Sequence, residues 1–288
     1  MTRIAYVNGR FQPIARAALP VEDRATQLAD GVYEVIKAVR GEPQDLDRHL
    51  DRLDRSLAAL RIRPRFSRAA LTIVIREVLR RNRLQDAAIY IQVDRGTAPR
   101  NHLFPKHGRA NVIVTARRAV WPRAGEIEDG VGVVTLPDQR WARCDIKSVA
   151  LLPNLLAKQQ AAEAGCREAW LLDGHGRITE GASSNAWIVD RDGRLITPPL
   201  SPAILGGVTR SVVLELAREA GLEVVLRHFS LEEARGAREA FLTSTTSLVL
   251  PVTSIDGRPV ANGKPGSITR SLLATYLQRI GLVLARVS

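Results

Sequence analysis

The chain has little lysine, little cysteine and few aromatic residues. It carries only five lysines against 37 arginines in 288 residues. Its two cysteines, Cys144 and Cys166, are too few for a disulfide framework or a zinc site, so we expect reduced thiols and no bound metal. Aromatic residues make up 5% of the chain, which leaves few surfaces on which nucleic-acid bases could stack.

Long hydrophobic runs are also missing. No apolar stretch approaches the roughly 20 residues that a membrane helix requires, and residues 1–9 lack the charged start and apolar stretch of a signal peptide. The sequence therefore predicts a cytoplasmic protein that has no membrane contact.

The net charge of +12 raises the alternative of a basic nucleic-acid-binding protein that is not an enzyme. The arginines, however, are spread over the whole chain and interleaved with Asp and Glu. We therefore expect no nucleic-acid partner and interpret the charge as suited to small anionic ligands, such as a phosphate or a carboxylate.

The hydrophobic pattern predicts a mixed α/β (α+β) protein of two domains. Because the pattern breaks at Val120-Trp121-Pro122, we expect an N-terminal domain over residues 1–120, a linker over 121–125 and a C-terminal domain over 126–288. Asn8-Gly9 predicts a tight hairpin turn, and Ser67 is the expected N-cap of a helix. Periodicity predicts strands at 4–7, 32–39, 88–93, 111–114, 132–136, 168–172, 186–189, 224–226 and 239–242, and helices at 46–60, 68–80, 154–164, 208–220 and 267–279.

Lys147 is the candidate residue for covalent catalysis. Arginine cannot replace a lysine that must lose its proton and attack a carbonyl. In a chain so poor in lysine, Lys147 in Asp-Ile-Lys-Ser is a candidate Schiff-base residue for pyridoxal 5′-phosphate, at the expected end of a strand that leads into a helix. We expect Lys158, on that helix, to face solvent, and Lys106 and Lys264 to lie in surface loops.

Pyridoxal phosphate also requires an anion beside its pyridine nitrogen, which must stay protonated for the ring to accept electrons. Glu180 is the candidate anion, in an expected polar turn before the strand at 186–189. Ser183, Ser184 and Asn185 follow it and are expected to hydrogen-bond the carboxylate and orient it.

The cofactor phosphate requires backbone amides and a cation. Gly206 and Gly207 lead into the helix expected from Val208, whose first free amides can face an anion. A second cluster of hydroxyls and amides at 243–247, which includes Thr245, can complete the phosphate cup. Arg52 is the candidate cation, although helix periodicity alone predicts a solvated arginine at this position.

These segments together resemble the class IV aminotransferases of pyridoxal-phosphate fold type IV. The resemblance rests on Asp145-Ile146-Lys147-Ser148, Thr179-Glu180-Gly181-x-Ser183-Ser184-Asn185, Gly207-Val208-Thr209-Arg210 and Thr243-Ser244-Thr245-Thr246. It implies a barrel-like mixed sheet in the C-terminal domain and a homodimer. It also implies that Lys147 bonds the cofactor, that Glu180 pairs with the pyridine nitrogen, and that Arg52 binds the phosphate with the amides of Val208 and Thr209.

Within this family the chain is most similar to the D-amino-acid aminotransferases. The matching residues are Arg100 and His102 in Arg-x-His, with Tyr33 from an early strand, and the resemblance implies that they bind the substrate α-carboxylate. The implied reaction is transamination between D-amino acids, such as D-alanine, and a 2-oxo acid. The alternatives are a branched-chain L-amino-acid aminotransferase, which carries a glutamate where Ser184 stands, and an aminodeoxychorismate lyase of the same fold.

Overall fold

The computed structural model describes residues 3–282, so residues 1–2 and 283–288 of the two expected domains lie outside the described residues. The chain divides into two compact units. Unit 1 contains the residues up to Val120 together with Ile146–Leu151, and unit 2 contains Trp121–Asp145 and the chain from Leu152 onward. The segment Ile146–Leu151, which carries Lys147, thus belongs to unit 1, whereas the predicted C-terminal domain, residues 126–288, includes it.

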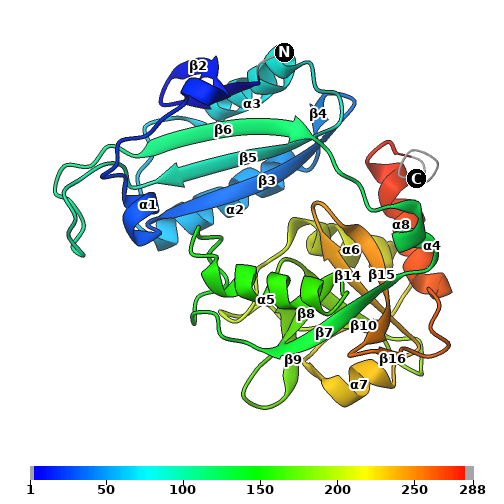
Figure 1. Cartoon of the computed structure of the whole chain (residues 1–288). Coiled ribbons are helices and arrows are strands. Elements are labelled where there is room, and N and C mark those ends of the chain that lie inside the picture. The colour runs from blue at the N-terminus through cyan, green and yellow to red at the C-terminus, as the bar shows by residue number, and fades with distance from the viewer. Residues whose placement is uncertain (1–2, 283–288) are drawn as a thin grey trace. The chain divides into compact units, whose positions relative to one another are not determined.

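Unit 1 is one six-stranded sheet with helices (Figure 1). The sheet order is β2-β1-β6-β5-β3-β4, and the neighbouring strands are antiparallel. Its elements are β1 (Ile4–Val7), β2 (Arg10–Pro13), a 3₁₀ turn (Ile14–Arg16), α1 (Arg24–Leu28), β3 (Gly31–Val39), β4 (Glu42–Pro43), α2 (Leu46–Ala59), α3 (Arg68–Asn82), β5 (Ala87–Asp94) and β6 (Asn111–Arg118).

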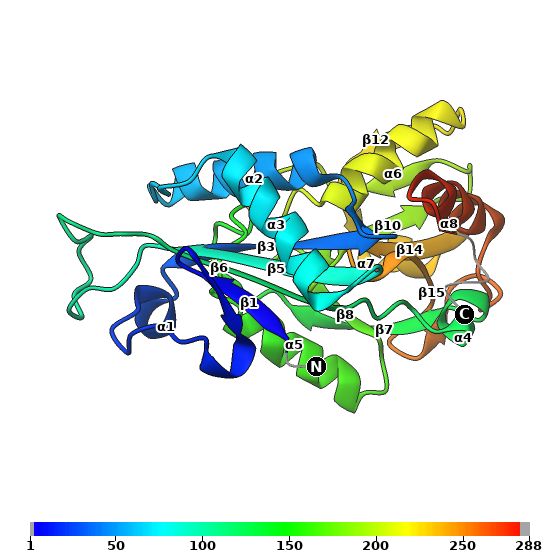
Figure 2. The ribbon, with the colours of Figure 1, turned by 90° about the horizontal axis from the view of Figure 1, so that it is seen from above.

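Local sequence signals explain several of these elements. Asn8 and Gly9 both have positive φ, 49° and 93°, as a two-residue hairpin turn requires, and they join β1 to β2. The Ser67 hydroxyl accepts a hydrogen bond from the Ala70 amide and caps α3. Figure 2 shows α2 and α3 on one face of the sheet. The core lies between these two helices and the sheet, where the leucines of α2 pack against the even-numbered residues of β3, such as Val32 and Ile36.

Unit 2 is built on a ten-stranded sheet (Figure 1). The strand order is β12-β11-β10-β14-β15-β7-β8-β9-β13, and β16 pairs with β15. Its elements are α4 (Ala124–Glu128), β7 (Val131–Pro137), α5 (Leu152–Glu163), β8 (Glu168–Leu172), β9 (Arg177–Gly181), β10 (Asn185–Val189), β11 (Leu195–Thr197), α6 (Val208–Glu219), β12 (Val224–Leu226), β13 (Phe229–Ser230), α7 (Leu231–Arg235), β14 (Glu239–Ser244), β15 (Leu248–Ile255), β16 (Arg258–Pro259) and α8 (Ser267–Arg279).

The sheet of unit 2 is mixed and curled. β7 runs parallel to β8 and β15, and β11 runs parallel to β12, while the other pairs are antiparallel. This confirms the predicted mixed α/β class with a barrel-like sheet. Small side chains let α5 approach closely, because buried Ala157 and Ala161 pack against Ala169 of β8.

Five strands of unit 2 were absent from the sequence prediction, namely β9, β11, β13, β15 and β16. β15 contains Pro251, which normally argues against a central strand. Its parallel pairing with β7 begins only at Val252, after the proline. The missing N–H group of Pro251 therefore removes no hydrogen bond from the pairing with β7. β9 carries Glu180, which was predicted to lie in a polar turn. Among residues 3–282, no helix is both long and apolar enough to cross a membrane.

Candidate active site

Lys147 lies in an extended segment of unit 1 beside β3. Its carbonyl accepts a hydrogen bond from the Tyr33 amide (2.9 Å), and its amide donates to the Ser56 hydroxyl on α2 (3.3 Å). Its Nζ atom lies 4.1 Å from the centre of the Tyr33 ring. The expectation that Lys147 sits directly between a strand and a helix was wrong, because the irregular segment 138–151 separates β7 from α5. The backbone contact with β3 fixes the lysine instead.

Arg52 is buried on α2, which corrects the interpretation that it is solvated. Its Nε and Nη2 atoms donate to the two carboxylate oxygens of Glu34, at 2.7 and 2.8 Å. His49 Nδ1 lies 2.8 Å from the same carboxylate. Burial would raise the pKa of Glu34, but the charge and hydrogen bonds of Arg52, with His49, lower it to about 2. The ionised Glu34 therefore holds the guanidinium in one orientation.

Glu34 and His49 were not predicted from the sequence. Glu34 follows Tyr33 on β3, so alternation points it toward the helices, into the same face as Val32 and Ile36. A charged residue on the apolar face of a strand is the signal that could have identified it, because such a residue needs a buried partner.

The other lysines differ in their surroundings. Lys106 and Lys264 are exposed, as predicted. Lys158 is half-buried, because its Nζ donates to the Arg167 carbonyl (2.6 Å) and pairs with Glu168 (3.4 Å), so the expectation of a solvent-facing lysine was wrong. Lys37 of β3 is 3% exposed, and burial lowers its pKa to about 7 against the opposing charge of Asp45.

Glu180 lies on β9, with 4% of its surface exposed. Both of its oxygens accept the Leu205 amide at 3.1 Å, and Oε2 also accepts the Asn185 side-chain amide at 2.9 Å. Oε1 accepts a short hydrogen bond from Arg140 Nη1. Burial raises the pKa of Glu180 to about 7, although the charge of Arg140 opposes the shift. The carboxylate is thus held rigidly and lies close to its protonation midpoint at neutral pH.

Arg140 is the principal partner of Glu180 and was not predicted. Its Nε and Nη2 atoms also form a two-point ion pair with Asp138, at 2.9 and 2.8 Å, and the Thr179 hydroxyl donates to Asp138 at 2.9 Å. Arg140 precedes the Asp-Ile-Lys-Ser segment in an irregular stretch. Sequence periodicity gives no signal there, so only the folded contacts identify it.

The serines after Glu180 do not hydrogen-bond it, contrary to expectation. The Ser183 and Ser184 hydroxyls donate to Glu168 at 2.7 and 3.0 Å, and only Asn185 reaches Glu180. Glu168 is buried at the start of β8 and fixes the turn between β9 and β10. The serine pair therefore shapes the turn, and Asn185 orients the carboxylate.

The start of α6 lies beside this carboxylate network. A Cβ atom on Gly207, the N-cap of α6, would lie 2.1 Å from the Asn185 amide oxygen, so only glycine fits. Val208 and Thr209 are buried in the first turn, whose amides have no partner within the helix. The close approach brings these amides next to the residue that orients Glu180.

Arg210, also in the first turn of α6, is buried with an unusual hydrogen-bonding pattern. Its Nη2 atom donates to the Pro198 carbonyl at 2.7 Å, whereas its Nε atom has no hydrogen-bond partner within residues 3–282. Burial lowers its pKa to about 10, opposed by the charge of Glu180, so it remains a cation at neutral pH.

The hydroxyl cluster at 243–247 joins β14 to β15. Asn185 at the start of β10 pairs with Thr243 near the end of β14. The cluster therefore lies at the end of these two strands where Asn185 contacts Glu180. The Thr243 hydroxyl accepts a core hydrogen bond from Trp187 (2.9 Å), and the Ser244 hydroxyl caps the Ser247 amide (2.9 Å). Thr245 is half-buried in the turn. The turn that contains Thr245 therefore follows the end of β14 that pairs with Asn185, the residue that orients Glu180.

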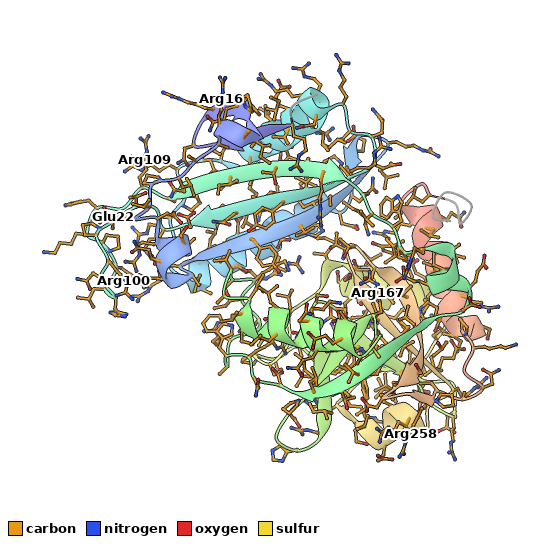
Figure 3. The ribbon with its side chains drawn as sticks, in the orientation of Figure 1. Arg16, Glu22, Arg100, Arg109, Arg167 and Arg258 are labelled. Atoms are coloured by element: carbon orange, nitrogen blue, oxygen red, sulfur yellow. The ribbon has the colours of Figure 1, made fainter. Side chains whose placement is uncertain are left out.

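Arg100 and His102 lie in the exposed loop 95–110 between β5 and β6. Figure 3 shows Arg100 at the end of unit 1 from which this loop projects. Within the described chain neither side chain forms a hydrogen bond or an ion pair with Tyr33. The structure thus brings Tyr33 to Lys147 and leaves Arg100 and His102 presented on the surface.

Comparison with known proteins gives a consistent result. The family model described as Amino-transferase class IV matches residues 31–255. The D-alanine aminotransferase of Bacillus licheniformis is 40% identical over 265 residues, which cover 92% of this chain and 93% of that protein. The D-alanine aminotransferase of Staphylococcus haemolyticus is 37% identical over 272 residues, 94% of this chain and 95% of that protein.

Solved structures with the same fold include two branched-chain amino acid aminotransferases. The Escherichia coli structure superposes with a TM-score of 0.91 at 27% identity and covers 98% of this chain and 96% of its own. The structure of the T.th. enzyme, determined with pyridoxamine 5′-phosphate, superposes with a TM-score of 0.90 at 28% identity and covers 97% of this chain and 94% of its own.

Proposed function

The chain belongs to the class IV aminotransferases, and from this premise we propose that it transfers the amino group of D-amino acids, such as D-alanine, to a 2-oxo acid. Its cofactor is pyridoxal 5′-phosphate. The observation that carries the substrate assignment is the 36–40% identity to several D-alanine aminotransferases over more than nine-tenths of the chain. A 2-oxo acid such as pyruvate or 2-oxoglutarate accepts the amino group.

Each of the two units contains donor groups of the kind that this cofactor requires. Lys147 supplies the amine for the covalent link, and Glu180 supplies the buried anion for the ring nitrogen. The free amides of Val208 and Thr209, with the hydroxyl of Thr245 and the charge of Arg52, supply the phosphate site. The free amides in the first turn of α6 and the Nε atom of Arg210, which has no hydrogen-bond partner among residues 3–282, both favour an anion at the start of α6.

When bound, pyridoxal phosphate supplies the group that accepts the amino nitrogen and the electrons of the Cα–H bond. With the cofactor bound, Lys147 Nζ would act as a general base toward the proton on the substrate α-carbon and as a general acid toward the cofactor carbon that receives this proton. Arg140, Asn185 and the Leu205 amide hold Glu180 in place. Glu180 keeps a proton on the ring nitrogen through its negative charge.

Tyr33, Arg100 and His102 bind the substrate carboxylate. A guanidinium, an imidazole and a phenol supply several donors to one carboxylate. The position of Tyr33 beside Lys147 Nζ supports this role. With the carboxylate fixed and the α-hydrogen facing Lys147, only one enantiomer is productive.

The selectivity of the purified enzyme tests the proposed function. Initial rates are measured with D-alanine, L-alanine, D-leucine and L-leucine, each with 2-oxoglutarate. We expect a clear preference for D-alanine over L-alanine. A preference for L-leucine would contradict the proposal and favour the branched-chain alternative, for which the solved structures of the same fold are the specific support.

Replacing Arg100 with alanine should weaken substrate binding. The change removes a charge-assisted hydrogen bond of about 1.5–3 kcal/mol, so we expect the KM for D-alanine to rise roughly tenfold or more. Cofactor affinity should stay within about twofold, because other residues bind the phosphate. Arg109→Ala, at an exposed arginine of the same loop, is the matched control. An unchanged KM in Arg100→Ala would contradict the role of this loop.

We also propose that the enzyme is a homodimer. Leu152, Leu155 and Leu156 form an exposed apolar stripe at the start of α5, with exposed fractions of 66%, 60% and 54%. Such a patch is unusual on the surface of a monomer, and the exposed Arg100 and His102 can serve a second chain. We expect sedimentation at the mass of two chains and a shift toward monomer in Leu155→Glu. Ile73→Glu, at an exposed apolar residue of α3, should not shift the mass. A wild-type mass of one chain would contradict the dimer.

We propose a cytoplasmic location, which the two thiols support. Cys144 and Cys166 are unpaired. The Cys144 thiol donates to the Trp141 carbonyl at 3.1 Å, and burial raises its pKa to about 11. A thiol in this state is poorly reactive and is compatible with a reducing compartment.

A further inference from the structure

The loop 95–110 is fastened to the segment that precedes β3. The Arg24 amide donates to the Gly96 carbonyl at 3.0 Å, and the Ala98 amide donates to the Glu22 carbonyl at 3.2 Å. Figure 3 shows Glu22, Arg100 and Arg109 at the same end of unit 1. The base of the loop therefore has a fixed backbone path.

Gly96 closes the base. Its φ is +95°, and a Cβ atom there would lie 2.0 Å from the Arg109 carbonyl oxygen. The two ends of the loop are therefore pressed together, and only glycine satisfies both the conformation and the close approach.

Side chains hold the loop through Asp30. Its Oδ2 atom accepts from Arg24 Nε at 2.8 Å and from Arg95 Nε at 2.7 Å, and its Oδ1 atom accepts from Arg95 Nη2 at 2.9 Å. All three side chains are at least nine-tenths buried. Burial favours the neutral acid, but Arg95 and Arg24 together hold the pKa of Asp30 below its usual range.

Each arginine also reaches a second part of the structure. Arg24 Nη1 donates to the carbonyl of Asn101 at 2.7 Å, and Asn101 stands between Arg100 and His102 in the sequence. The guanidinium of Arg95 lies 3.6 Å from the centre of the ring of Phe104, which follows His102 by two positions in the sequence. The same guanidinium donates to the Leu60 carbonyl (2.7 Å) at the end of α2.

We propose that Asp30, Arg24 and Arg95 form a positioning cluster that holds loop 95–110 in the conformation that presents Arg100 and His102 to the substrate carboxylate. The proposal rests on the proposed function of that loop. None of the three residues touches the substrate in this account. They reduce the entropy that the loop loses when substrate binds, so they act on KM and leave the chemical step unchanged.

Two variants test the cluster on the holoenzyme. Asp30→Asn removes the charge between the arginines. Arg24→Lys keeps the positive charge, but a lysine lacks the planar guanidinium group with which Arg24 donates to Asp30 and Asn101 together. It is the milder of the two changes. For both variants we expect a KM for D-alanine raised roughly five- to tenfold, with kcat and cofactor affinity within about twofold of the wild-type values.

Limited proteolysis supplies a readout that does not depend on activity. Thermolysin cleaves before exposed leucines, and Leu103 is 75% exposed between His102 and Phe104. We expect cleavage at this site to be roughly tenfold faster in both variants, because a released loop opens more often. Asp54→Asn, which removes the exposed Asp54–Arg68 ion pair of the same unit, is the matched control and should change neither value.

Unchanged cleavage and KM in both Asp30→Asn and Arg24→Lys would overturn the proposal. Faster cleavage with an unchanged KM would overturn it as well, because the cluster would then stabilise the loop without serving substrate binding. The Arg100→Ala variant separates this result from a failure of the proposed function. It should raise KM without changing the cleavage rate, so an unchanged KM there contradicts the carboxylate role of the loop itself.

Discussion

Replacing Lys147 with alanine should abolish transamination and the covalent cofactor absorbance. The change removes the amine that bonds the cofactor and also the group that moves the α-proton, and a general acid–base group alone contributes about 10²–10⁴-fold. We therefore expect a loss of roughly 10⁴-fold or more in steady-state rate with D-alanine. Lys147→Arg should be equally inactive, because a guanidinium keeps its proton at neutral pH.

Lys37 supplies the matched control for this prediction. It is a buried lysine of the same unit, and burial lowers its pKa to about 7, so on chemistry alone it is a possible nucleophile. Lys37→Met should retain the cofactor absorbance. Substantial activity in Lys147→Ala without added amine, or a loss of the absorbance in Lys37→Met with an intact fold, would contradict the assignment of Lys147.

Replacing Glu180 with glutamine should slow the proton-transfer step about a hundredfold, which corresponds to about 3 kcal/mol. Glutamine has nearly the same size, and its side-chain oxygen can still accept from Arg140 and the Leu205 amide, whereas its NH2 group cannot accept from Asn185. It carries no negative charge, however, and no longer keeps the ring nitrogen protonated. Single-turnover rates with D-alanine measure the effect, and cofactor affinity should change less.

The pH dependence follows from the pKa of Glu180. Because this pKa is raised to about 7, the carboxylate gains a proton as the pH falls below neutrality and loses the charge that the ring nitrogen requires. The wild-type single-turnover rate should therefore fall as the pH is lowered below about 7. The rate of Glu180→Gln should not show this decrease with pH.

Glu239 offers a control of the same kind as Glu180. It is a buried carboxylate of unit 2 that accepts the Ile268 and Thr269 amides at the start of α8. Glu239→Gln should lower thermal stability and leave the single-turnover rate unchanged. An unchanged rate in Glu180→Gln would contradict the role of Glu180 as the anion beside the ring nitrogen.

Regular elements were predictable where the sequence pattern is local. The leucines of α2, the serine cap of α3 and the Asn-Gly turn each act within a few residues, and the structure has all three. β15 was missed because it contains Pro251. The strand tolerates this proline because its pairing with β7 starts only after it, and the local sequence pattern does not show which strand is the partner.

The candidate site divides in the same way. Lys147 and Glu180 were predicted from short motifs because the cofactor demands those functional groups. Arg140 and Glu34, which hold Glu180 and Arg52, were missed, since each is defined by a contact with a residue distant in the sequence. The burial of Arg52 was mispredicted for the same reason, because Glu34 supplies the charge that makes a buried guanidinium stable.

Reductive trapping of the holoenzyme tests the central claim most directly. Borohydride reduces the bond between the lysine and the cofactor and makes the label permanent, and peptide mapping by mass spectrometry then locates it. We expect the label on the peptide that contains Lys147, and we expect incubation with D-alanine before reduction to prevent labelling more effectively than incubation with L-alanine. A label on the peptide that contains Lys37, or no label at all, would contradict this expectation.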